Sequence, residues 1–208
     1  MREKNKKRRR ESKNIPTAKK MLLLCEGDTE EAFFRHELKG YRNIEVVNVG
    51  GGGYKRIADK LAENKDLYRI FLVVCDLDKA HKNPDEMSRL GEVIKWLQTN
   101  GGENNIFLTY ENFECWVAAY IGINISDDYN KVLANLGYKK GEAVVSFLQD
   151  HEGDTNKARE LFASIDATEY FFWKEGMKWK ASYNKANSGR RQSNLVYFFD
   201  YLKLLINR

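Results

Sequence analysis

Two apolar runs decide the fold: Met21-Leu22-Leu23-Leu24-Cys25 and Ile70-Phe71-Leu72-Val73-Val74-Cys75. Each has the length and the nearly continuous hydrophobicity of a strand that is covered on both faces. The first run is followed directly by Glu26-Gly27, and the second by Asp76-Leu77-Asp78. The sequence therefore predicts two buried strands that both end in carboxylates.

The rest of the first half alternates strand and helix signals. Further strands are predicted near residues 44–49 and 105–109, and apolar residues recur at helical spacing in residues 29–38, 54–67 and 84–97. This order predicts an α/β fold, with a mostly parallel, four-stranded, Rossmann-like sheet flanked by helices. Because residues 44–49 alternate apolar and polar side chains, we expect that strand to lie near an edge of the sheet.

Three regions are expected along the chain. Residues 1–18 form a basic tail without apolar partners, which is typical of a disordered segment. Residues 19–125 hold the predicted α/β domain, and residues 126–208 are predicted to form a helical C-terminal extension. Helices in that extension are expected near residues 126–136, 139–150, 154–165 and 193–206.

The composition favours a cytoplasmic globular protein without a membrane partner. Hydrophobic residues make up 42% of the 208 residues, and no apolar run approaches the roughly 20 residues of a membrane span. The N-terminus lacks the apolar segment of a secretory signal, and the three cysteines are expected to be buried and reduced. The net charge of +5 includes a basic block at residues 2–10. This block is either a solvated tail or an arm that binds phosphates.

The carboxylates at the two strand ends suggest a metal site. In an open α/β sheet, ligands bind at the carboxyl ends of the strands. Alternation along a strand sends Asp76 and Asp78 to the same side, and Glu26 is expected at the same edge. Oxygen ligands of this kind suit Mg²⁺ or Mn²⁺ together with the oxygens of a substrate phosphate. The alternative is that the two aspartates cap local turns.

Three further residues are candidates for the same site. Glu30 lies four residues after Glu26, in a first helical turn, where a carboxylate also complements the helix dipole. Lys79 either neutralises a phosphate oxygen or is a solvated loop lysine. Glu114 follows the fourth strand in another first helical turn and has the same two interpretations as Glu30. The predicted catalytic group is therefore Glu26, Glu30, Asp76, Asp78, Lys79 and Glu114, with Glu26, Asp76 and Asp78 as the metal ligands.

Other features have two interpretations each. Gly50-Gly51-Gly52-Gly53 would let a nucleic-acid backbone approach, or would be a mobile connection, and it lacks the spacing of a P-loop. His81 is either a proton donor or a surface histidine. Basic residues are interleaved with aromatic ones between Trp173 and Arg191. That pattern suits contacts with single-stranded nucleic acid, or a hydrophobic anchor beside a solvated loop.

The motifs at the strand ends resemble a known family. Glu26 after the first strand, with Asp76-x-Asp78 after a later one, resembles the TOPRIM fold of topoisomerases, primases and OLD-type nucleases. The string Leu24-Cys25-Glu26-Gly27-Asp28-Thr29-Glu30, followed by Phe33-Phe34, is more specifically similar to the RloB-like family of bacterial defence-associated TOPRIM proteins. That family opens with Cys-Glu-Gly-x-x-Thr-Glu, so this chain is one residue shorter there. Phe113-Glu114-x-Trp116 matches the second half of the family segment Asn-Pro-x-Phe-Glu-x-Trp, and Tyr110-Glu111 replaces its Asn-Pro.

The resemblance implies a Mg²⁺-dependent nucleic-acid enzyme of phage defence. In it Glu26, Asp76 and Asp78 would hold the metal, with Glu30 and Glu114 as supports. Because the chain has no P-loop, an ATPase or sensor would be a separate subunit. Our leading hypothesis is a nuclease that cleaves phosphodiester bonds in RNA or DNA. The alternatives are a non-catalytic module that senses a nucleotide or nucleic acid with a partner protein, and nucleotidyl transfer as in primases.

Overall fold

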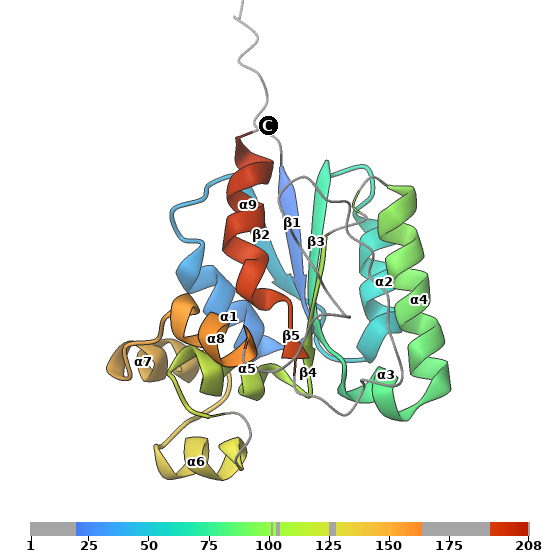
Figure 1. Cartoon of the computed structure of the whole chain (residues 1–208). Coiled ribbons are helices and arrows are strands. Elements are labelled where there is room, and N and C mark those ends of the chain that lie inside the picture. The colour runs from blue at the N-terminus through green and yellow to red at the C-terminus, as the bar shows by residue number, and fades with distance from the viewer. Residues whose placement is uncertain (1–19, 101, 103–104, 125–127, 164–191, 208) are drawn as a thin grey trace, which may run out of the picture.

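The computed structural model describes residues 20–100, 102, 105–124, 128–163 and 192–207. In this part of the chain, helices cover both faces of a five-stranded sheet (Figure 1). The strands are β1 (Met21–Cys25), β2 (Ile44–Asn48), β3 (Ile70–Asp76), β4 (Ile106–Tyr110) and β5 (Gln192–Ser193). The helices are α1 (Asp28–Glu37), α2 (Gly53–Glu63), α3 (Asp78–Lys82), α4 (Pro84–Thr99), α5 (Phe113–Tyr120), α6 (Tyr129–Asn135), α7 (Ala143–Asp150), α8 (Thr155–Ala163), the 3₁₀ helix η2 (Leu195–Tyr197) and α9 (Phe198–Ile206). The predicted α/β class, with four parallel strands flanked by helices, is confirmed.

The strand order creates a crevice between β1 and β3. The order is β2-β1-β3-β4-β5, and β1 to β4 run parallel. The chain passes from β1 outward to β2 and then returns to the other side of β1 to form β3. The order therefore reverses between β1 and β3, and parallel α/β sheets bind ligands at such switch points. As predicted, β2 lies at an edge of the sheet.

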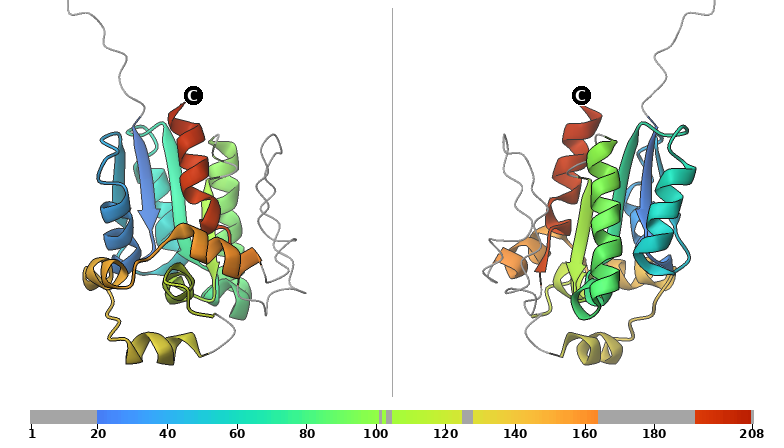
Figure 2. Two further views of the ribbon diagram at one scale, coloured as in Figure 1. Left: turned by 60° about the vertical axis from the view of Figure 1, so that its left-hand side comes forward. Right: turned by 90° about the vertical axis from the view of Figure 1, so that its right-hand side faces the viewer.

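Alternate strand residues enter two separate apolar clusters, one on each face of the sheet. Leu23, Leu72 and Phe107 belong to the cluster that includes residues of α1, α5 and α9. Leu24 and Val73 belong to the other cluster, with residues of α2 and α4. Figure 2 shows α2 and α4 lying together on one face, with α1 and α9 on the opposite face. Burial on both faces explains why β1 and β3 are continuously apolar.

Three helices gather at the end of the sheet to which the parallel strands point (Figure 2). They are α6, α7 and α8, and they correspond to the helices expected near residues 126–136, 139–150 and 154–165. Their apolar residues join the cluster of α1 and α5. No helix in the described ranges is long and apolar enough to cross a membrane. The three cysteines are free and buried, as predicted.

The last described segment differs from the prediction. A helix was expected from residue 193, but Gln192 and Ser193 form β5, antiparallel to β4, before η2 and α9 begin. The Asn194 side chain extends this pairing. Its Oδ1 accepts a hydrogen bond from the Leu108 N–H (2.6 Å), and its Nδ2 donates to the Ile106 carbonyl (2.9 Å). Because Asn194 and Leu108 are 86 positions apart, no local sequence pattern indicates this contact.

We predict that Asn194→Ala destabilises the protein by about 2–4 kcal/mol, because it leaves two buried backbone groups of β4 without hydrogen bonds. Asn64→Ala is the matched control. Asn64 is half-buried and donates one side-chain hydrogen bond to the Lys60 carbonyl at the end of its own helix. Loss of this one hydrogen bond should lower the free energy of unfolding by about 1 kcal/mol or less. Urea unfolding followed by circular dichroism measures both values, and equal losses would contradict the assigned role of Asn194.

Candidate active site

The candidate site lies at the carboxyl ends of β1, β3 and β4. Glu26 directly follows β1, and Asp76 is the last residue of β3. Glu30 and Glu114 lie in the first turns of α1 and α5, the helices that follow β1 and β4. Parallel strands bring all these turns to one edge of the sheet, so carboxylates that are distant in sequence meet there.

A pocket of about 590 Å³ opens at this edge. Four of the six predicted residues line it: Glu26, Glu30, Asp76 and Glu114. The other lining residues are Gly27, Asp28, Thr29, Gly50, Gly51, Phe113, Lys140 and Gly141. A fifth predicted residue, Lys79, forms an ion pair with the pocket residue Glu26. The pocket therefore collects acidic side chains from three separate strand-to-helix turns.

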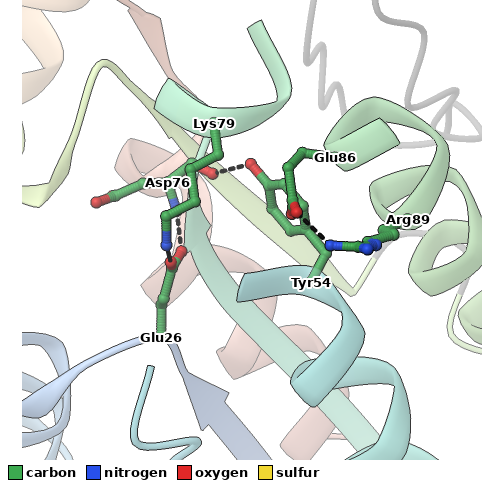
Figure 3. Close-up of polar contacts among 6 residues, drawn as sticks. All are labelled: Glu26, Tyr54, Asp76, Lys79, Glu86 and Arg89. Atoms are coloured by element: carbon green, nitrogen blue, oxygen red, sulfur yellow. Dashed lines mark hydrogen bonds and ion pairs between the residues drawn. The ribbon is translucent and has the colours of Figure 1, made fainter. Parts of the chain in front are cut away.

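Glu26 connects the ends of β1 and β3. Its Oε1 pairs with Lys79 Nζ at 2.6 Å, and its Oε2 accepts a hydrogen bond from the Asp76 backbone N–H at 3.3 Å. Figure 3 shows Lys79 reaching from α3 to Glu26, while the Asp76 side chain extends from β3 on the side away from Tyr54. The buried Tyr54 hydroxyl donates to the Asp76 carbonyl. The backbone that carries Asp76 is therefore held from both sides.

Glu30 is a buried acid, only 6% exposed. Burial is the main cause that raises the pKa of Glu30 to about 7 from its ordinary 4.5. The nearby Glu26 and Glu114 carboxylates also raise it, whereas the Glu30 backbone N–H and Lys140 lower it. A Cβ atom at Gly27 would lie 3.2 Å from Glu30 Oε2, so the glycine leaves room for this carboxylate. Near neutral pH, Glu30 can therefore accept or release a proton.

Sequence reasoning missed two pocket residues, Lys140 and Gly141, in the connection between α6 and α7. Lys140 Nζ pairs with Glu114 Oε1 at 2.6 Å, and this hydrogen bond raises the pKa of Lys140. The Gly141 N–H donates to Thr29 Oγ at 2.9 Å, which holds the connection against the start of α1. No local sequence pattern marks either residue as part of a site. A lysine in a polar connection is normally solvated.

The glycine run forms another part of the pocket wall. Gly50, Gly51, Gly52 and Gly53 have φ angles of 71, 75, 88 and 65°, a left-handed conformation that glycine adopts without strain. Gly50 and Gly51 line the pocket, and the Gly51 N–H donates to the Glu26 carbonyl at 3.3 Å. The loop is thus joined to the end of β1. Its contact with a phosphate backbone stays a prediction.

Some predicted features lie outside the described residues. The backbone of Asp78 and His81 belongs to α3, but the side chains of both residues fall outside the described part of the chain. The basic and aromatic segment between Trp173 and Arg191 and the tail at residues 1–18 also fall outside it.

The pocket has the donor chemistry of a site for a hard divalent cation. Its acidic side chains offer only oxygen ligands, which Mg²⁺ prefers. A bound cation would also relieve the repulsion among carboxylates that contributes to the raised pKa of Glu30. Among the described residues, no three His, Cys, Asp or Glu side chains converge closely enough to hold a metal ion. Glu26 contacts Lys79, so a metal at Glu26 would compete with that ion pair.

No protein-family model, curated protein or solved structure shows significant similarity to this chain. The resemblance to TOPRIM and RloB-like proteins therefore depends on the motifs around Glu26, Asp76 and Glu114.

We predict that Glu30→Gln changes the pH dependence of stability. The pKa of Glu30 is about 7 in the folded protein and near 4.5 when unfolded, so the folded state binds this proton more tightly. The free energy of unfolding of the wild type should then fall as pH rises from about 4.5 to about 7. Glutamine does not titrate, so the Glu30→Gln variant should not show this fall. Between about pH 5 and about pH 8, its free energy of unfolding relative to that of the wild type should therefore rise by on the order of 2–3 kcal/mol.

Urea unfolding in the presence of a chelator measures this difference. Glu92→Gln, on the exposed face of α4, removes the same kind of side chain outside the pocket and serves as the control. A Glu30→Gln variant whose stability parallels the wild type across this pH range would contradict the buried, proton-binding state of Glu30.

Proposed function

We propose that this chain is a metal-dependent nuclease that cleaves phosphodiester bonds in RNA or DNA. The observation that carries the proposal is the pocket at the switch point of the sheet, which Glu26, Glu30, Asp76 and Glu114 line together. Acidic side chains at the carboxyl ends of parallel strands are suited to binding a cation and a phosphate together. The motif resemblance to RloB-like TOPRIM proteins supports the same activity.

In this proposal, Glu26 and Asp76 hold Mg²⁺ or Mn²⁺ together with Asp78. The cation would polarise the scissile phosphate and stabilise the leaving oxygen. Glu30 and Glu114 orient the site from the first turns of α1 and α5. The N-termini of these helices also favour a phosphate, because the helix dipoles attract negative charge.

The side chains of the pocket supply proton transfer and positive charge. Glu30 has a pKa of about 7, which suits a general base that takes a proton from the attacking water. Lys79 and Lys140 now pair with Glu26 and Glu114. When a cation takes over these carboxylates, each ammonium group is free to contact a phosphate oxygen of the substrate.

The resemblance also suggests a biological role for the proposed nuclease. It supports a cytoplasmic effector of phage defence, controlled by a separate ATPase or sensor subunit. Control of this kind is expected for a nuclease, because unregulated cleavage of cellular nucleic acid would be toxic.

We predict that the purified chain cleaves RNA or DNA pools with Mg²⁺ or Mn²⁺, and that Asp76→Asn lowers the rate at least about a hundredfold, as loss of one preorganised electrostatic group does. Asp66→Asn, at an exposed position before β3, is the matched control and should cut at the wild-type rate. Gel electrophoresis of end-labelled substrates measures the rates. Equal cutting by wild type and Asp76→Asn would exclude this site. Tight nucleic-acid binding without turnover under any metal would favour the sensing module instead.

We also predict that Mn²⁺ or Mg²⁺ at millimolar concentration raises the thermal midpoint of the wild type, because a ligand that binds only the folded state stabilises it. The rise should shrink in Asp76→Asn and persist in Asp66→Asn. Differential scanning fluorimetry against chelator measures it without any substrate. Equal rises in both variants would show that the metal binds outside the pocket.

A further inference from the structure

A second groove lies at the opposite end of the sheet from the carboxylates. It has a volume of about 450 Å³. Its lining residues are Lys20, Met21, Arg35, Leu38, Lys39, Tyr41, Arg42, Asn43, Ile44, Glu45, Val46 and Tyr68. They come from the starts of β1 and β2, the end of α1, the turn after it and the segment before β3. The lining includes four cationic side chains and one carboxylate, so its charge is strongly positive.

Three of these cations are available to a ligand. Lys20, Lys39 and Arg42 are exposed, and none of them forms an ion pair with a described carboxylate. The single acidic side chain of the groove, Glu45, accepts a hydrogen bond from the Tyr68 hydroxyl at 2.6 Å. This hydrogen bond leaves the negative charge of Glu45 in place, but Lys20, Lys39 and Arg42 outnumber it, so the net charge that faces a ligand is positive.

The walls of the groove are held in place by the fold. Arg35 pairs with Glu31 at 2.7 Å and donates to the Val46 carbonyl of the edge strand β2 at 2.9 Å. The Met21 N–H donates to the Asn43 carbonyl at 2.8 Å, and the Arg69 N–H donates to the Lys20 carbonyl at 3.1 Å. The backbone that carries the free cations is thus tied to the sheet, which lowers the entropy lost when a ligand binds.

We propose that this groove binds the phosphodiester backbone of a nucleic acid. Clustered lysine and arginine side chains neutralise phosphates and release counterions from the nucleic acid. Tyr41 and Tyr68 line the same groove, and tyrosine rings beside cations suit the stacked bases of a single strand better than a free phosphate ion. Binding here needs no metal and no hydrolysis, so it stands independently of the nuclease proposal.

The position of the groove suggests a use for this binding, and that use rests on the proposed function of the pocket. The groove and the carboxylate pocket lie at opposite ends of β1, which has five residues and spans about 16 Å. That length equals about five base-pair steps of a nucleic-acid helix. A nucleic acid longer than this can contact the groove while another part of it reaches the pocket, so the groove would favour long polymers over short fragments.

The experiment compares two double variants of the full chain that lose the same charge. Lys39→Gln/Arg42→Gln removes two cations from the groove, and Lys95→Gln/Lys203→Gln removes two exposed lysines from α4 and α9 outside it. Fluorescence anisotropy with single-stranded RNA and DNA of roughly 12 nucleotides, in a chelator, measures affinity against salt. The groove variant should bind at least about tenfold more weakly, and its salt slope should fall by about 1.4, or about 0.7 per lost contact. The control should keep the wild-type slope.

Several outcomes would overturn the proposal. Equal losses in both double variants would mean that only the overall charge matters. A loss confined to acidic lipid vesicles, or to inorganic phosphate, would assign the groove to a different ligand. The charge-conserving Lys39→Arg/Arg42→Lys variant should bind as tightly as the wild type. Such a result would show that substitution at these two positions weakens binding only when the positive charge is lost, and not through a folding defect. Because no metal is present, failure of the nuclease assay would leave this result unaffected.

Discussion

The parallel register of β1 with β3 is the constraint on which the site depends. Cys25 lies opposite Val74, so Glu26 emerges beside the end of β3 and reaches the Asp76 N–H. Sliding β1 by one residue would turn Glu26 toward the other face of the sheet and would exchange the β1 side chains that fill the two apolar clusters. The free energy that keeps the carboxylates together therefore comes mainly from hydrophobic burial on the two faces of the sheet.

The pocket gathers like charges, and three features limit their repulsion. The N-termini of α1 and α5 face the carboxylates, Glu30 is able to hold a proton, and two lysines form ion pairs at the rim. The side chains of Lys79 and Lys140 are 46% and 74% exposed, so their ion pairs contribute little to stability. In the proposed function, a cation or phosphate would displace these weak ion pairs at small cost, and the buried Glu30 would respond through its protonation state.

Those parts of the fold that depend on local patterns could be predicted from sequence. β1 and β3 are apolar throughout because both faces are covered, and Glu26 and Asp76 follow from where those runs end. β5 could not be predicted, because its two residues form a strand only by pairing with β4. The role of Lys140 could not be predicted for a related reason. Its partner Glu114 lies in α5, and only the packing of α6 and α7 brings the two side chains together.

The contacts that Lys140 and Gly141 make with Glu114 and Thr29 are the last contacts of the pocket to become possible during synthesis, because these two residues come last in the chain among those that line it. A chain still growing on the ribosome acquires Glu26, Glu30, Asp76 and Glu114 before the residues that close the pocket have been added. Until Lys140 and Gly141 emerge, Glu114 lacks its counter-charge and the start of α1 lacks its neighbour. During synthesis, this edge of the sheet therefore has its four carboxylates before it has Lys140, and the later helices add both a counter-charge and a neighbour for α1.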